Sequence, residues 1–281
     1  MNLTTKILSY IKITRPINVL ITFLVVVVAI LITQKEQTDF STILLASIAA
    51  SLVAAAGNIV NDIYDVESDK ISHPNRVLIL GMVSKSEAAY LINFLNIIAI
   101  IIASRLSEIL FLLVIFSSVV LFLYSFYLKK IPLVGNIVIA LLTGLAFIYG
   151  GFTSGNPVAA IIPAVFAFLI NLIREIVKDI QDIEGDTKAG VITFPIKFGF
   201  KKSKTLILII TISLILYTLY PFITELYKIE YFIVVMVIVN PLLILSLKFL
   251  FDSKKENNLS VISNMLKLNM VLGLIAIYLG K

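Results

Sequence analysis

The sequence predicts an all-α integral membrane protein, built as a single domain of nine transmembrane helices. Three observations lead to this fold class. The chain is 59% hydrophobic with a mean hydropathy of +1.05, its charged fraction is only 14% against about a quarter in soluble domains, and apolar runs near the ~20 residues that cross a bilayer recur throughout. Because lipid cannot satisfy backbone hydrogen bonds, and the short alternating segments of a barrel are missing from the sequence, these runs are predicted to be helices.

The first span follows Pro16 and is long enough to remain in the membrane, so the charged stretch before it does not indicate a cleaved signal. Each later span begins after a short polar link, as expected for antiparallel neighbours in a bundle. The nine spans are expected at residues 16–33, 41–62, 86–104, 108–128, 132–152, 158–178, 204–223, 229–250 and 260–279. No soluble domain is expected beside them, so residues 1–281 are treated as one membrane domain.

Composition also restricts the chemistry. The chain has no cysteine, which excludes disulfides, thiolate catalysis and cysteine-bound metals. It has one histidine, His73, which excludes a histidine-rich metal site. Any metal used by this protein must therefore be a hard cation held by oxygen atoms.

The net charge of +6 follows the predicted topology and does not indicate nucleic-acid binding. With the links numbered alternately, one side of the membrane holds Lys6, Lys12, Arg15, Lys70, Arg76, Lys85, Lys129, Lys130, the run 174–204, Lys248, Lys254, Lys255 and Lys267. The other side holds Lys35, Arg105, Lys228 and Lys281. By the positive-inside rule, we expect a multi-pass protein of the cell membrane with a cytoplasmic N-terminus and an external C-terminus.

Two longer links, 63–85 and 179–203, lie on the predicted cytoplasmic side and contain most of the acidic residues. Acidic or amide side chains at offsets 0, 4, 7 and 11 occur twice, as Asn58, Asp62, Asp65 and Asp69 and as Glu175, Asp179, Asp182 and Asp186. In a helix these offsets fall on one narrow stripe, so each link is expected to continue the preceding span. Gly185 and Gly190 predict that the second helix breaks near Asp186.

Carboxylates stacked on one helix face repel one another, and a cation between two such stripes would convert the repulsion into coordination. Mg²⁺ fits because it takes oxygen ligands and bridges carboxylates to substrate phosphates. The alternative is a solvated acidic surface paired with nearby lysines. Two stripes with matching offsets, each at the end of a span, favour the metal site.

The sequence resembles the UbiA-type intramembrane prenyltransferase superfamily at these residues. The first family motif, NDxxDxxxD, is matched by Asn61, Asp62, Asp65 and Asp69, and the second, DxxDxxxD, by Asp179, Asp182 and Asp186. An Asn75-Arg76 pair and a Tyr124-Ser125…Lys129-Lys130 ending of the fourth span also match. Val77 replaces a common proline, and Lys130 replaces a frequent arginine, which weakens the case for bidentate phosphate binding there.

The resemblance implies a central apolar cavity with the two motifs facing each other over its mouth. It implies Mg²⁺ as cofactor and a prenyl diphosphate as substrate. Asn61, Asp65, Asp182 and Asp186 are then expected to bind metal, and Arg76, Lys129 and Lys130 to bind diphosphate. Asp62, Asp69 and Asp179 are expected to bind metal too or to support these ligands, and Tyr64, Tyr124 or Tyr127 could stabilise a cation, although packing is the expected role of each.

The acceptor is less constrained. The second motif region most resembles archaeal members of the family that transfer a geranylgeranyl group from geranylgeranyl diphosphate to geranylgeranylglyceryl phosphate, and Lys188 is the candidate ligand of that acceptor's phosphate. An aromatic acceptor, as in quinone biosynthesis, is the alternative within the family. A secondary transporter would instead require ionisable residues near the midplane. Asn171, Asn240 and Asn269 fall in or near spans, where hydrogen bonding between helices is the expected role.

Overall fold

The computed structural model describes residues 2–252 and 257–281, so Lys254 and Lys255 lie outside the described part of the chain. It confirms the predicted all-α bundle: the described residues contain nine helices long and apolar enough to cross a membrane. The spans are α2 (Pro16–Thr33), α3 (Phe40–Tyr64), α5 (Lys85–Leu106), α6 (Glu108–Phe126), α7 (Val134–Thr153), η2 and α8 (Pro157–Ala160, Ile161–Gln181), α11 (Phe200–Ile223), α12–η3–α13 (Ile229–Val234, Val235–Val239, Asn240–Asp252) and α14 (Asn257–Gly280).

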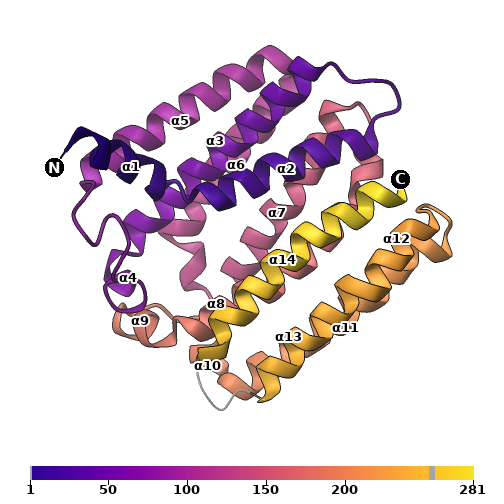
Figure 1. The fold of residues 1–281 in the computed structure, drawn as a ribbon. Helices are drawn as coiled ribbons and strands as arrows, with labels where there is room; N and C mark the ends of the chain where they lie inside the picture. The colour runs from indigo at the N-terminus through magenta and orange to yellow at the C-terminus, as the bar shows by residue number, and fades with distance from the viewer. Residues whose placement is uncertain (1, 253–256) are drawn as a thin grey trace.

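Shorter helices lie between the spans. They are α1 (Leu3–Ile13), α4 (Val66–Ser72), η1 (Leu128–Lys130), α9 (Ile183–Lys188) and α10 (Phe194–Phe198). α1 is tied to the start of α5 through Glu87, which accepts hydrogen bonds from Lys6 Nζ at 2.8 Å and from Tyr10 Oη at 3.0 Å. α4 follows α3 and α9 follows α8, and the two short helices lie at the same end of the bundle (Figure 1).

The spans pack as two groups that meet along α2, α7, α8 and α14. α3 packs against α2, α5 and α6, whereas α8 packs against α7, α11 and α14. Figure 1 shows α14 crossing the bundle between α2 and α7 on one side and α12 and α13 on the other. The N-terminus and the C-terminus lie at opposite ends (Figure 1), as an odd number of spans requires.

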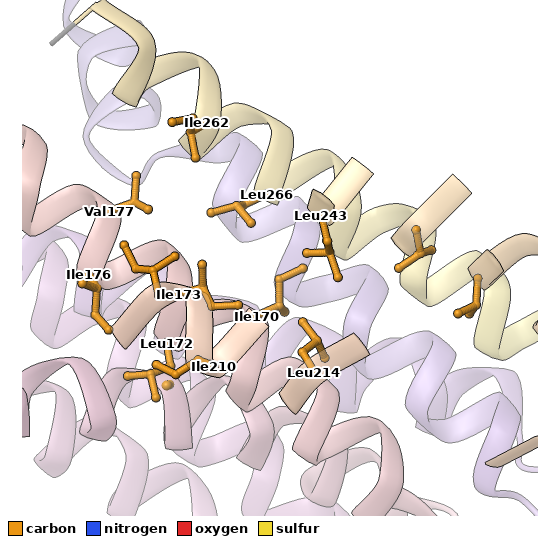
Figure 2. Packing of buried hydrophobic residues seen from close by; sticks show 14 of the residues in the cluster. Ile170, Leu172, Ile173, Ile176, Val177, Ile210, Leu214, Leu243, Ile262 and Leu266 are labelled. Carbon is orange, nitrogen blue, oxygen red and sulfur yellow. The ribbon is translucent and has the colours of Figure 1, made fainter. Parts of the chain in front are cut away.

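The largest apolar core surrounds α8. Figure 2 shows the side chains of α8 facing those of α11, α13 and α14. The residues labelled there are Ile170, Leu172, Ile173, Ile176, Val177, Ile210, Leu214, Leu243, Ile262 and Leu266. The five of them that belong to α8 occupy one face of this helix. Its opposite face, which carries Asn171, Arg174 and Lys178, lines the central cavity instead.

Large apolar side chains cover the outside of the spans. Ile97, Phe116, Leu216 and Val237 are each at least half exposed, although they lie in the middle of their helices. In water such a surface would drive aggregation. The chain is therefore an integral membrane protein, with these side chains against lipid.

The three span asparagines singled out from the sequence, Asn171, Asn240 and Asn269, bond between helices, as predicted. Asn171 Nδ2 donates to Thr143 Oγ1 at 2.9 Å, and Asn240 Nδ2 donates to Thr218 Oγ1 at 3.1 Å. Asn269 Nδ2 donates to the carbonyl of Val239 at 3.2 Å. These bonds link α8 to α7, α13 to α11, and α14 to η3.

Candidate active site

Each acidic motif is placed at a joint between a span and a short helix. α3 ends at Tyr64 and α4 begins at Val66, with Asp65 between them at φ −92° and ψ 3°. α8 ends at Gln181 and α9 begins at Ile183, with Asp182 between them at φ −98° and ψ 8°. The prediction of continuous helices was therefore wrong at these two aspartates, and the break expected near Asp186 lies four residues earlier.

The two joints are brought together because α4 packs against α9. Gly185 allows the close approach: a Cβ at this position would lie 2.8 Å from the backbone carbonyl oxygen of Ser68. The hydroxyl of Ser68 donates to Asp186 Oδ1 at 2.8 Å across the same contact. Gly185 thus serves helix packing, whereas Gly190, at φ +70°, follows the end of α9 as predicted for a helix terminus.

Between the joints is a polar chamber of about 80 Å³. Both motifs contribute side chains to its wall, together with cations and hydrogen-bonding groups from neighbouring elements. The polar lining residues are Arg15, Asn61, Asp65, Ser68, Asp69, Arg76, Tyr124, Lys129, Asn136, Glu175, Lys178, Asp179, Asp182, Asp186 and Thr193.

The carboxylates of the first motif are paired with cations. Asp62 accepts from Arg15 and, at 3.3 Å, from Arg76. Asp69 pairs with Arg76, and Asp65 pairs with Lys129. Asp65 also accepts from Asn61 Nδ2 at 2.6 Å.

The second motif has mainly neutral partners. Asp179 accepts from Asn136 Nδ2 at 2.9 Å, and Asp186 accepts from the Ser68 hydroxyl. His73 Nε2 lies 3.2 Å from Asp182 Oδ1, but without hydrogen-bond alignment. This buried oxygen therefore has no hydrogen-bond donor among the described residues.

Burial shifts the ionisation of the groups in the link regions. It raises the pKa of Asp69 although Arg76 opposes the shift, and it raises the pKa of Asp186 to about 6. It lowers the pKa of Lys129 to about 8. Desolvation disfavours the charged form of the acids and of the lysine alike. A cation bound next to the carboxylates, or an anion bound next to Lys129, would therefore stabilise the charged form of its neighbours.

The donor atoms suit a hard divalent cation. Asn61, Asp65, Asp182 and Asp186 all line the chamber and offer only oxygen ligands of the kind that Mg²⁺ prefers. No three acidic or histidine side chains are already gathered around one point in the described residues. In the first motif, Arg15, Arg76 and Lys129 occupy carboxylate oxygens that a metal would take.

The chamber adjoins an apolar cavity of about 260 Å³ in the centre of the bundle. Its wall comes from α2, α3, α6, α7, α8 and α14. Five residues line both spaces: Arg15, Asn61, Tyr124, Glu175 and Lys178. A ligand could therefore hold a charged head in the chamber and an apolar chain among side chains such as Val53, Leu113 and Leu142.

Of the other residues singled out from the sequence, some line the chamber and others lie outside it. Arg76 and Lys129 line the chamber, whereas Lys130 is exposed and is not part of its wall. Lys188 pairs with Glu184 at 2.8 Å on the surface, with 59% of its side chain exposed. Tyr124 faces the site, while Tyr64 packs on Phe122 and Phe126.

Sequence reasoning did not single out several residues that line the site. In the sequence, Arg15 stands out only as a topology signal. In the structure, Pro16 prevents α1 from continuing, and the turn at Arg15 (φ 57°) precedes α2. Arg174 and Lys267 lie inside spans, where an ionisable residue is by default a functional candidate. That signal was available from the sequence alone.

Comparison with known proteins gave one family model. The model described as the UbiA prenyltransferase family matches residues 19–271. The digeranylgeranylglyceryl phosphate synthase of Methanosphaera stadtmanae is 31% identical over 96% of this chain and 98% of its own length. The enzyme of the same name from Methanothermobacter thermautotrophicus is 40% identical over 70% of this chain and 69% of its own.

Solved structures share the fold. A structure presented as giving structural and mechanistic insights into digeranylgeranylglyceryl phosphate synthase in membranes superposes with a TM-score of 0.77, 30% identity and 98% coverage of both chains. A UbiA homolog from Archaeoglobus fulgidus bound to GPP and Mg²⁺ superposes with a TM-score of 0.67 and 20% identity, covering 96% of this chain and 99% of its own. The second similarity concerns the fold alone.

Proposed function

This chain belongs to the UbiA prenyltransferase family, and we propose that it transfers a geranylgeranyl group from geranylgeranyl diphosphate to the glycerol hydroxyl of geranylgeranylglyceryl phosphate. The observation that carries the proposal is the direct connection of a charged chamber to an apolar cavity inside the membrane. A prenyl diphosphate needs both environments within one molecule's length. The relatives named digeranylgeranylglyceryl phosphate synthase supply the choice of acceptor.

The diphosphate would enter the chamber and compete for the cations that hold the first motif. Arg76 and Lys129 line the chamber from the link regions, and both are partly desolvated. Arginine grips phosphate as a planar fork, whereas lysine acts as a point charge. Lys130 is the third predicted contact, and from its exposed position it would act at longer range.

Asn61, Asp65, Asp182 and Asp186 would hold Mg²⁺, with Asp62, Asp69 and Asp179 binding it too or supporting the ligands. The bound metal would supply positive charge that neutralises the oxygens of the departing diphosphate. The carboxylates that lost Arg76 and Lys129 to the diphosphate would then be free to bind the metal. Such an exchange would account for the opposite charges held in one chamber.

The reaction breaks the bond between allylic C1 and the diphosphate oxygen and forms a bond from C1 to the glycerol oxygen. The hydroxyl proton passes to a basic oxygen of the departing diphosphate, so the products are the ether and protonated diphosphate. Apolar walls exclude water, which would otherwise capture the allylic cation. Tyr124 lines both spaces, and in this proposal its ring would face that cation.

The test uses purified protein with labelled geranylgeranyl diphosphate, Mg²⁺ and two acceptors at equal concentration. We expect transfer to geranylgeranylglyceryl phosphate and little or none to 4-hydroxybenzoate. Faster prenylation of hydroxybenzoate would assign the chain to an aromatic acceptor. The site residues would then keep their roles toward the diphosphate.

The same proposal places the chamber on the cytoplasmic side. The chain contains no cysteine, so single cysteines can report orientation without background. A membrane-impermeant thiol reagent should label Glu67→Cys only from inside and Glu36→Cys only from outside, since both positions are exposed in links on opposite sides. The reverse pattern would invert the topology.

A further inference from the structure

A cluster of positive charge lies at the polar end of the central cavity, which Arg15 also lines, and it is apart from Arg76 and Lys129 of the chamber. It consists of Arg174 and Lys178 on α8 and Lys267 on α14, and all three line the cavity. Arg174 and Lys178 are four residues apart, so they share one face of their helix. Lys267 reaches the same space from the last span.

Two of the three cations, Arg174 and Lys178, are paired with the same carboxylate, that of Glu175. Glu175 Oε1 accepts from Arg174 Nη1 at 3.1 Å, and its Oε2 accepts from Lys178 Nζ at 2.9 Å. Within the described part of the chain, no ion pair is formed by Lys267, and Arg174 Nε is buried without a hydrogen-bond partner. Buried donors and charges are costly when unpaired, so this arrangement lacks an anion.

The geometry of Arg174 indicates the kind of anion. Its Nη1 is used by Glu175, while the Nε edge of the guanidinium is left without a partner in the described residues. Such an edge can donate to two oxygens of a phosphate. A doubly charged phosphomonoester would also balance the excess of cations better than a single carboxylate would.

We propose that Arg174, Lys178 and Lys267 bind the phosphate of the acceptor lipid, an assignment that rests on the function proposed above. The cluster is separate from Arg76 and Lys129, the cations assigned to the donor diphosphate. Lys178 and Glu175 line both the cavity and the chamber. A phosphate held there places the attached glycerol at the boundary where the allylic carbon must lie.

The surroundings also provide for the acceptor's chain. Met270 lies one helical turn beyond Lys267 and lines the central cavity together with a neighbouring apolar cavity of about 70 Å³. Gly273, Leu274 and Ile277 continue that lining along α14. The acceptor chain can therefore run along α14 from the phosphate, leaving the central cavity to the donor chain.

The experiment compares Lys267→Met with Lys267→Arg and with Lys248→Met, a control that removes an exposed lysine of α13. Binding of geranylgeranylglyceryl phosphate is measured first in chelator without donor, because the cluster requires no metal. We expect Lys267→Met to weaken this binding by about tenfold or more, as for loss of one charge-assisted hydrogen bond. Lys267→Arg should retain most of the affinity, and Lys248→Met all of it.

Steady-state kinetics then separate the two substrates. Lys267→Met should raise KM for the acceptor by a similar factor while KM for geranylgeranyl diphosphate changes less than about twofold. With the dephosphorylated acceptor, geranylgeranylglycerol, wild type and Lys267→Met should be equally slow. An equal rise in both KM values, or an unchanged preference for the phosphorylated acceptor, would overturn the assignment.

Two further arms identify the ligand. Inorganic phosphate at tenfold excess should not displace the lipid; displacement would mean that the cluster binds a free anion. Failure of the proposed function is visible separately, since wild type would then neither bind nor prenylate the lipid phosphate. Melting temperatures of the variants establish that each one is folded.

Discussion

The two acidic motifs have the same backbone design but different electrostatics. Asp65 and Asp182 occupy equivalent joints with nearly the same dihedral angles. The first motif is held by Arg15, Arg76 and Lys129, whereas the second is held by an amide, a hydroxyl and a nearby imidazole. The first therefore stores cations for a phosphate, and the second stores negative charge for a metal.

Removal of divalent metal should have the largest effect. Within the described part of the chain, the carboxylates of the second motif form no ion pair with lysine or arginine, so without a metal they would repel the negative charge of an incoming diphosphate. We expect a chelator to abolish transfer and added Mg²⁺ to restore it, as measured with labelled donor. Full activity in excess chelator would mean that the chain's cations alone stabilise the leaving group.

Replacing a joint aspartate should be nearly as severe. Asp65→Ala and Asp182→Ala are each expected to reduce kcat by at least about two orders of magnitude, the scale for losing transition-state charge stabilisation. The comparison is sharpened by titrating Mg²⁺: Asp182→Ala should shift the half-saturating concentration further than Asp65→Ala. Equal shifts would show that the motifs share the metal evenly.

Stability without metal should change in opposite directions in the two motifs. Asp62→Asn leaves Arg15 without its carboxylate, so it should lower the free energy of unfolding by about 1–3 kcal/mol. Asp179→Asn keeps an oxygen that can accept from Asn136 and takes one carboxyl group out of a crowded set, so it should raise the melting temperature. Thermal unfolding of both variants in chelator is the measurement, and a lower melting temperature for Asp179→Asn would contradict the comparison.

A smaller effect on activity is expected for the two consecutive lysines after α6, and it should differ between them. Lys129→Ala should reduce kcat/KM for the donor by about tenfold or more, because Lys129 lines the chamber. Lys130→Ala should cost less than about threefold, because its exposed charge is screened by solvent. Equal losses would move Lys130 into direct contact with the diphosphate.

Sequence was a strong guide wherever periodicity or a motif carried the information. Nine apolar runs predicted nine spans, with ends that differ from the structure by a few residues. The offsets of the acidic residues predicted that each set would share one side. The joints at Asp65 and Asp182 were not predicted, because a helix with a local bend keeps nearly the same spacing as a straight one.

The partners of the motifs were harder to predict because they come from distant parts of the chain. Nothing in the local sequence around Arg15 or Asn136 indicates that they face Asp62 and Asp179. The sequence around Gly185 predicts a helix break, whereas in the structure this glycine allows α4 and α9 to touch. Such contacts depend on tertiary packing, which a single sequence does not encode at any fixed spacing.

The segregation of charge between the motifs has a consequence for biogenesis. All three cations that neutralise the first motif, Arg15, Arg76 and Lys129, precede α7 in the chain. A nascent polypeptide that has inserted only its first four spans already contains every member of these ion pairs. The carboxylates of the second motif leave the ribosome later. The growing chain therefore never presents both acidic sets to the translocation machinery while the first set still lacks its cations.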